Sequence, residues 1–162
     1  MSPDQHFTVN VEPFKRIIVA ASLRGARVLE IGAGHGEITQ LILDEEPAHL
    51  RAYELEPGLC SLKHSALELC ERSFVLGDVH SMRGWCMVSV PPYTLLGLIR
   101  ESLTWLAPSR VILLVPRRVL PAFSDFSIYE TIDGATGFEP PSNGEHAIIY
   151  RGFRIPNVQA RI

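Results

Sequence analysis

The chain has 162 residues, a length that predicts one domain spanning residues 1–162. Hydrophobic residues make up 46% of it and charged residues 20%, a balance typical of a folded globular protein and not of a disordered one. The formal net charge of −3 excludes the strongly basic composition that marks many nucleic-acid-binding domains, although local basic patches remain compatible with it.

The sequence also bears on membrane insertion, secretion and the use of its cysteines. No apolar run reaches the roughly 18 residues needed to cross a bilayer, and the opening segment MSPDQHF lacks the basic and apolar regions of a secretory signal. Cys60, Cys70 and Cys86 are odd in number and show no C-x-x-C spacing, so we expect neither a disulfide framework nor a metal site. Together these features predict a cytoplasmic protein without a membrane segment.

Strand-like and helix-like segments alternate along the chain, which predicts an α/β fold with a mostly parallel sheet and helices on both faces. The expected helices are Phe14–Leu23, Glu37–Leu43, a segment from Pro57 through Cys70, and Tyr93–Leu106. The expected seven strands are Arg27–Ile31, Leu50–Leu55, Phe74–Leu76, Cys86–Val90, Val111–Val115, Ser127–Ile132 and Ala147–Tyr150. We expect the last two to form an antiparallel pair that closes the sheet.

The most specific motif is a glycine-rich turn between the first expected strand and the helix that follows it. Glycines at positions 32, 34 and 36 allow the backbone to approach a ligand in conformations that a Cβ would obstruct. Ligands bind in the crevice beyond the carboxyl end of such a strand. The dinucleotide fingerprint G-x-G-x-x-G would need a glycine where Glu37 stands, and the lysine of a phosphate-binding loop is absent. The remaining pattern, E-x-G-x-G-x-G, resembles motif I of S-adenosylmethionine-dependent methyltransferases.

Acidic residues stand at the ends of the next two expected strands. Glu54 follows Gly34 by 20 residues, the spacing at which a carboxylate accepts both ribose hydroxyls in nucleotide-binding sheets, with Glu56 as the competing candidate. Asp78 could accept from an adenine amino group, although an aspartate after glycine is also common in turns. The carboxylate of Glu30 either orients the glycine turn or a ligand ammonium through water, or caps neighbouring backbone amides.

Several segments together resemble the ribosomal RNA adenine N6-dimethyltransferases. These segments are Gln5-His6-Phe7, Ile17-Ile18, Val28-Leu29-Glu30-Ile31-Gly32-Ala33-Gly34-His35-Gly36-Glu37-Ile38-Thr39, Ala52-Tyr53-Glu54-Leu55-Glu56 and Gly77-Asp78. The family carries Q-[NH]-F-L, V-L-E-I-G-P-G-x-G-x-L-T, A-x-E-x-D and G-D-A in this order and at this spacing, so the resemblance covers about the first 95 residues.

The resemblance implies a Rossmann-like methyltransferase domain that binds S-adenosylmethionine. Residues 1–25 would be an N-terminal segment and helix, 26–95 the cofactor-binding half and 96–162 a shortened C-terminal half. Contacts to the cofactor are implied for His6 and Thr8, for Gly32 under its methionine end, for Glu54 at the ribose and for Asp78 at the adenine. The expected cofactor-binding set is His6, Thr8, Glu30, Gly32, Ala33, Gly34, Gly36, Glu54, Leu55, Asp78, Val79 and Ser89.

The acceptor motif departs from the family. Where the family has N-L-P-Y, this chain has Val90-Pro91-Pro92-Tyr93. In the family the asparagine and backbone carbonyls accept from the target amino group, and the aromatic ring stacks on a flipped base. Val90 has no side-chain acceptor, so that role would fall to backbone carbonyls or to Ser89. The expected acceptor site is Ser89, Val90, Pro92 and Tyr93.

Three functions therefore stay open. An RNA methyltransferase follows the resemblance, although the family's helical C-terminal domain is missing and RNA would be held weakly or with a partner's help. A small-molecule methyltransferase fits the sequence pI of about 6.1 and the lost asparagine. The third is a non-catalytic cofactor-binding or scaffold protein that lost its target site. No sequence pattern indicates an oligomeric state.

Overall fold

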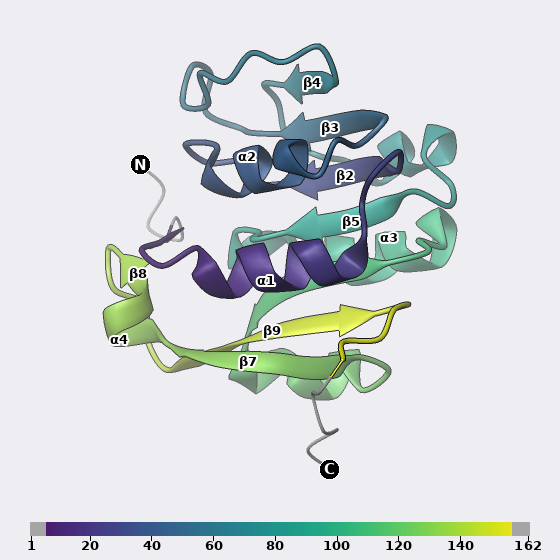
Figure 1. Cartoon of the computed structure of the whole chain (residues 1–162). Coiled ribbons are helices and arrows are strands. Elements are labelled where there is room, and N and C mark those ends of the chain that lie inside the picture. The colour runs from purple at the N-terminus through teal and green to yellow at the C-terminus, as the bar shows by residue number, and fades with distance from the viewer. Residues whose placement is uncertain (1–5, 157–162) are drawn as a thin grey trace.

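The computed structural model describes residues 6–156, which form a seven-stranded sheet with helices on both faces. The strand order is β4-β3-β2-β5-β6-β9-β7. Neighbouring strands from β4 to β6 run parallel, whereas β9 is antiparallel to both β6 and β7 (Figure 1). The predicted α/β fold, including the closing antiparallel strand, is confirmed.

The bounds of the elements follow the sequence pattern closely in most of the chain. The strands are β1 Phe7–Thr8, β2 Arg27–Ile31, β3 His49–Tyr53, β4 Leu67–Cys70, β5 Cys86–Ser89, β6 Val111–Pro116, β7 Ser127–Asp133, β8 Phe138–Glu139 and β9 Glu145–Arg151. The α-helices are α1 Glu12–Ala21, α2 Glu37–Asp44, α3 Leu96–Leu106 and α4 Gly134–Gly137. The 3₁₀ helices are η1 Leu76–Ser81, η2 Tyr93–Leu95 and η3 Arg117–Phe123.

Two apolar layers hold the helices to the sheet, because successive side chains of a strand point to opposite faces. On one face, Leu29 and Ile31 of β2 pack with buried residues of η1, α3 and η3. On the other, Val28 packs with the apolar stripes of α1 and α2. β2 and β5 therefore lie at the centre of the sheet, covered on both sides, and their carboxyl ends are held rigidly.

The segment between β3 and β4 differs from its prediction. The helix expected from Pro57 through Cys70 is wrong, as is the strand expected at Phe74–Leu76. Local hydrogen bonds compete with a helix here: His64 Nδ1 accepts from the Ala66 amide at 3.0 Å, and Glu71 accepts from the Gly58 amide at 2.6 Å. Residues Leu67–Cys70 then pair with β3, so that the third parallel strand lies earlier in the chain than its pattern predicts.

A second, two-stranded sheet joins distant parts of the chain. β1 pairs with β8 antiparallel, with Phe7 opposite Glu139 and Thr8 opposite Phe138. In Figure 1 this pair lies on the side to which the arrowheads of β2, β3 and β5 point. The N-terminal segment is thereby fixed next to the carboxyl ends of the central strands.

Candidate functional site

A cavity of about 170 Å³ lies at the carboxyl ends of β2, β3 and β5. Its walls come from the glycine turn, the end of β3, the segment after β4, the acceptor motif after β5 and the N-terminal segment. The lining residues are His6, Phe7, Thr8, Ile31, Gly32, Ala33, Gly34, Glu37, Ile38, Tyr53, Glu54, Leu55, Arg72, Ser73, Phe74, Val90, Pro91, Pro92, Tyr93, Thr94, Leu95, Leu114 and Phe138.

The glycine turn is anchored at both sides of this cavity. The amides of Gly32 and Ala33 donate to the Tyr53 carbonyl at 2.9 and 3.1 Å, which ties the turn to the end of β3. Gly32 has φ +85°, and a Cβ there would lie 3.0 Å from the Val90 carbonyl oxygen. A side chain at this position would therefore be strained and would press on the acceptor motif.

Gly36 forms the end of the glycine turn and lies outside the cavity. It has φ +99°, and a Cβ there would lie 2.7 Å from Leu62 Cδ1. It precedes the first residue of α2 and is not among the lining residues. The structure thus places Gly32 and Gly34 at the cavity and Gly36 behind it.

Glu54 connects the turn to β3. Its side chain accepts from the Gly34 amide at 2.9 Å through Oε2 and from the Glu56 amide at 3.0 Å through Oε1. The residue is 6% exposed and lines the cavity. A carboxylate has about four lone-pair positions, so each oxygen retains one that a ligand hydroxyl can occupy. The structure therefore fits a ribose-like diol at Glu54.

Glu30 is buried beneath the turn and does not line the cavity. Its Oε2 accepts from the Thr39 hydroxyl at 2.8 Å, while its Oε1 has no hydrogen-bond partner among the described residues. Burial raises the pKa of Glu30 to about 8, with a smaller contribution from the neighbouring carboxylates of Glu54 and Glu37 and with the Thr39 hydrogen bond acting in the opposite direction. Glu30 is therefore a neutral acid at neutral pH.

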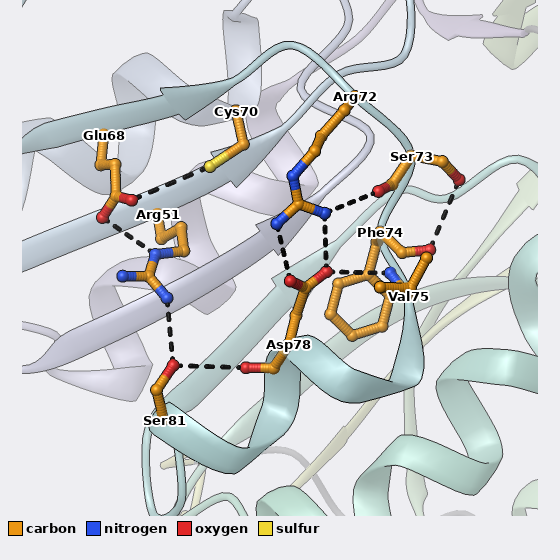
Figure 2. Close-up of polar contacts among 9 residues, drawn as sticks. All are labelled: Arg51, Glu68, Cys70, Arg72, Ser73, Phe74, Val75, Asp78 and Ser81. Carbon is orange, nitrogen blue, oxygen red and sulfur yellow. Dashed lines mark hydrogen bonds and ion pairs between the residues drawn. The ribbon is translucent and has the colours of Figure 1, made fainter.

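Asp78 lies outside the cavity, in η1, and so does Val79. Figure 2 shows that Asp78 faces Arg72, which donates to its Oδ1 at 2.6 Å and to its Oδ2 at 3.0 Å. The Val75 amide donates to Oδ2 as well, at 2.9 Å. The hydrogen bonds with Arg72 hold the pKa of Asp78 below its usual value. Arg72, Ser73 and Phe74 reach the cavity from this segment, and the sequence pattern singled out none of them as a site residue.

The acceptor motif lines the cavity except for Ser89. The Ser89 hydroxyl is buried and donates to the Ile31 carbonyl at 2.6 Å, so it links β5 to β2. Val90, Pro92 and Tyr93 all reach the cavity. The Tyr93 hydroxyl is hydrogen-bonded to Ser142 Oγ at 3.1 Å and to His146 Nε2.

The rings around Tyr93 were not expected from the sequence. His6 stacks on Tyr93 with ring centroids 5.8 Å apart, His146 lies 5.4 Å away at 22°, and the Arg118 guanidinium lies 5.7 Å from the ring centroid. His146 is fully buried, and burial lowers its pKa, as do the nearby His6 and Arg118. The only feature of the sequence that could have indicated this cluster is a single histidine, His146, directly before the apolar residues of β9.

The N-terminal segment reaches the cavity through His6, Phe7 and Thr8, and a contact of His6 and Thr8 with a cofactor stays a prediction. His6 Nδ1 is hydrogen-bonded to the Pro140 carbonyl at 2.9 Å, and a Cβ on Gly34 would lie 3.2 Å from Phe7 Cε1. Gln5, the first residue of the quoted Gln-His-Phe triplet, lies outside the described residues.

Residues 6–156 contain neither a membrane-spanning helix nor a cluster of metal ligands. No helix in this range is long and apolar enough to span a membrane. Within the same range, no group of three histidine, cysteine or acidic side chains is arranged to hold a metal ion.

Sequence comparison finds homologues for part of the chain. Over 77 residues, 46% of the chain, it is 39% identical to the probable ribosomal RNA small subunit methyltransferase A of Methanosarcina acetivorans. Over 55 residues, 34% of the chain, it is 44% identical to the ribosomal RNA small subunit methyltransferase A of Phytoplasma australiense. The matched stretches cover 28% and 19% of those two proteins. No protein-family model matches the chain.

Structural comparison extends over nearly the whole chain. The 23S rRNA methyltransferase ErmE superposes with a TM-score of 0.77 at 21% identity, over 91% of this chain and 70% of that one. A dimethyladenosine transferase from Plasmodium falciparum gives 0.68 at 16% identity, over 90% and 62%. The chain is therefore homologous over part of its length to proteins named ribosomal RNA small subunit methyltransferase A, and it has the fold of known methyltransferases.

Proposed function

We propose that the chain is a single S-adenosylmethionine-dependent methyltransferase domain that acts on RNA. The observation that carries this proposal is Glu54, whose carboxylate is fixed by the Gly34 amide at the cavity wall and retains a lone pair on each oxygen. The names of the sequence relatives support an RNA acceptor. Three free thiols agree with a cytoplasmic location, which we propose as well.

The residues that line the cavity support a proposed position for each part of the cofactor. Glu54 would hold the ribose hydroxyls, the Gly32–Gly34 backbone would lie under the methionine end, and His6 and Thr8 would close the cavity from the N-terminal segment. When bound, S-adenosylmethionine supplies a methyl group on a sulfonium, a leaving group that is already activated. The chain's own contribution is then mainly to hold the acceptor in line and to exclude water.

The acceptor side offers two polar groups in place of the missing asparagine. The Val90 carbonyl oxygen lies against Gly32, and the Tyr93 hydroxyl lies beside His146. The Ser89 hydroxyl already donates to the Ile31 carbonyl, so we propose that Ser89 supports the sheet and does not contact the acceptor. Hydrogen bonds from an acceptor amino group would then be received by the Val90 carbonyl and by Tyr93.

The crowding of Tyr93 favours a second candidate, a methyltransferase of small molecules. Its ring already contacts His6, His146 and Arg118. A base that stacks on Tyr93 must displace His6 or Arg118, whereas a small acceptor at the hydroxyl need not. The non-catalytic alternative is the outcome expected if the cofactor binds and no acceptor is methylated.

Calorimetric titration with S-adenosylmethionine tests the cofactor assignment. Two hydrogen bonds to a charged group contribute roughly 1.5–3 kcal/mol each, so Glu54→Ala should weaken binding by at least about a hundredfold. Glu56→Ala is the matched control, because Glu56 is the competing carboxylate and its side chain is exposed. Unchanged affinity of Glu54→Ala would refute the ribose assignment, and no binding by the wild type would refute the proposed cofactor.

Transfer of a tritiated methyl group tests the acceptor. Incorporation into total RNA, and not into a metabolite extract, is the expected result. Incorporation into the extract alone would favour the small-molecule candidate, and incorporation into neither would favour the non-catalytic one.

A further inference from the structure

The base end of the cavity presents an arginine where the sequence pattern predicts a carboxylate. Arg72, Ser73 and Phe74 line the cavity after β4, and Asp78 does not. Both carboxylate oxygens of Asp78 face Arg72, and one of them also accepts from the Val75 amide (Figure 2). Because Asp78 does not line the cavity and most of its lone pairs already receive these three hydrogen bonds, it is poorly placed to receive an adenine amino group.

Arg72 retains hydrogen-bonding capacity. A guanidinium has five N–H donors, and the structure shows three of them donating: two to Asp78 and one to the Ser73 carbonyl. The Arg72 guanidinium also lies 5.1 Å from the ring centroid of Tyr53, another lining residue. The ion pair with Asp78 and the ring of Tyr53 thus fix a flat donor group at the cavity wall, with its charge balanced by Asp78.

We propose that Arg72, not Asp78, contacts the base of the bound cofactor, and that Asp78 is a positioning residue that holds Arg72. This inference rests on the proposed function. An arginine only donates hydrogen bonds, so it recognises acceptor atoms: the ring nitrogens N3 or N7, which accept in both adenine and hypoxanthine, or the carbonyl oxygen of hypoxanthine. The base end of the cavity should consequently tolerate replacement of the exocyclic amino group by a carbonyl.

The test compares two ligands by titration calorimetry, S-adenosylhomocysteine and its hypoxanthine analogue S-inosylhomocysteine. The wild type should bind both within about tenfold of each other. A site built to accept from the amino group would reject the analogue by roughly 10⁴-fold, because a polar group would be left unpaired. Strong rejection by the wild type would overturn the proposal without any variant.

Substitutions then separate the two residues. Arg72→Ala should weaken binding of both ligands by about tenfold, the equivalent of one hydrogen bond. Arg72→Lys should recover only part of this loss, because a lysine ammonium lacks the planar, paired N–H donors of a guanidinium. Asp78→Asn should have a smaller effect, and none when Arg72→Ala is already present. Wild-type affinity in Arg72→Ala together with a loss in Asp78→Asn would overturn the assignment.

Arg51→Ala is the matched control. Arg51 also lies over an aromatic ring, that of Trp85 at 5.4 Å, and also pairs with a carboxylate, that of Glu68, but it does not line the cavity. Its replacement should leave both affinities unchanged. If the wild type binds neither ligand, the proposed function and this inference both fail. If it binds both and Arg72→Ala does so equally well, only this inference fails.

Discussion

The buried acid Glu30 should make the stability of the protein fall as pH rises toward the pKa of this carboxyl group in the folded state. Its side chain is 1% exposed, and burial raises its pKa from 4.5 to about 8. Between the ordinary glutamate pKa of 4.5 and about 8, the folded protein therefore holds a proton that the unfolded chain has released. Stability falls as pH rises whenever the folded state binds more protons. The slope due to Glu30 is about 1.4 kcal/mol per pH unit below the folded pKa and about half that at the folded pKa, so Glu30 should remove about 1.7 kcal/mol between about pH 6.5 and 8.

Urea unfolding of the wild type and of Glu30→Gln at several pH values from 6.5 to 8 measures this slope. Glutamine has the same shape and does not ionise. The stability of this variant should therefore depend less steeply on pH, by about 1.4 kcal/mol per pH unit near pH 6.5 and by about half that near pH 8. Any constant change in stability caused by the amide does not affect this slope. Glu101→Gln, which removes an exposed carboxyl group on α3, should keep the wild-type slope. Equal slopes for the wild type and Glu30→Gln would refute the assignment of a buried neutral acid.

Two further predictions concern other parts of the site. The pKa of His146 is lowered by burial, His6 and Arg118, so its neutral form stabilises the fold at pH values above its ordinary pKa of 6.5, and this stability should be lost as pH falls below it. His146→Gln should flatten that acid-side dependence in thermal melts, and an unchanged profile would contradict it. Gly36→Ala should destabilise the fold by more than Gly58→Ala, since both have positive φ but only at Gly36 does a Cβ meet another atom within 4 Å. Chemical denaturation should show a difference of about 1–3 kcal/mol, and equal losses would mean that Leu62 moves aside.

The sequence predicts the central strands well because they are apolar, short and bounded by clear turns. Arg27–Ile31 has the bounds of β2, and the carboxylate at position 54 follows directly from the end of β3. These features are local, so a pattern of residue types is enough to find them.

The edge of the sheet is harder to predict. Leu59, Leu62, Ala66 and Leu69 are spaced as in a helix, yet the pairing of Leu67–Cys70 with β3 decides the structure there. The pattern also could not show that Arg72 and Asp78, six residues apart, would face each other, or that His146 would meet Tyr93 from 53 residues away. Such contacts depend on tertiary packing that residue spacing does not encode.

The pairing of β1 with β8 has a consequence for the order in which the protein is made. Phe7 and Thr8 leave the ribosome long before their partners Glu139 and Phe138. Synthesis adds about 5–20 residues per second, so the N-terminal wall of the cavity cannot close until β8 has been made and has emerged. A nascent chain can thus fold its central strands first, but a ligand that needs the whole cavity can be bound only after β8 has paired with β1.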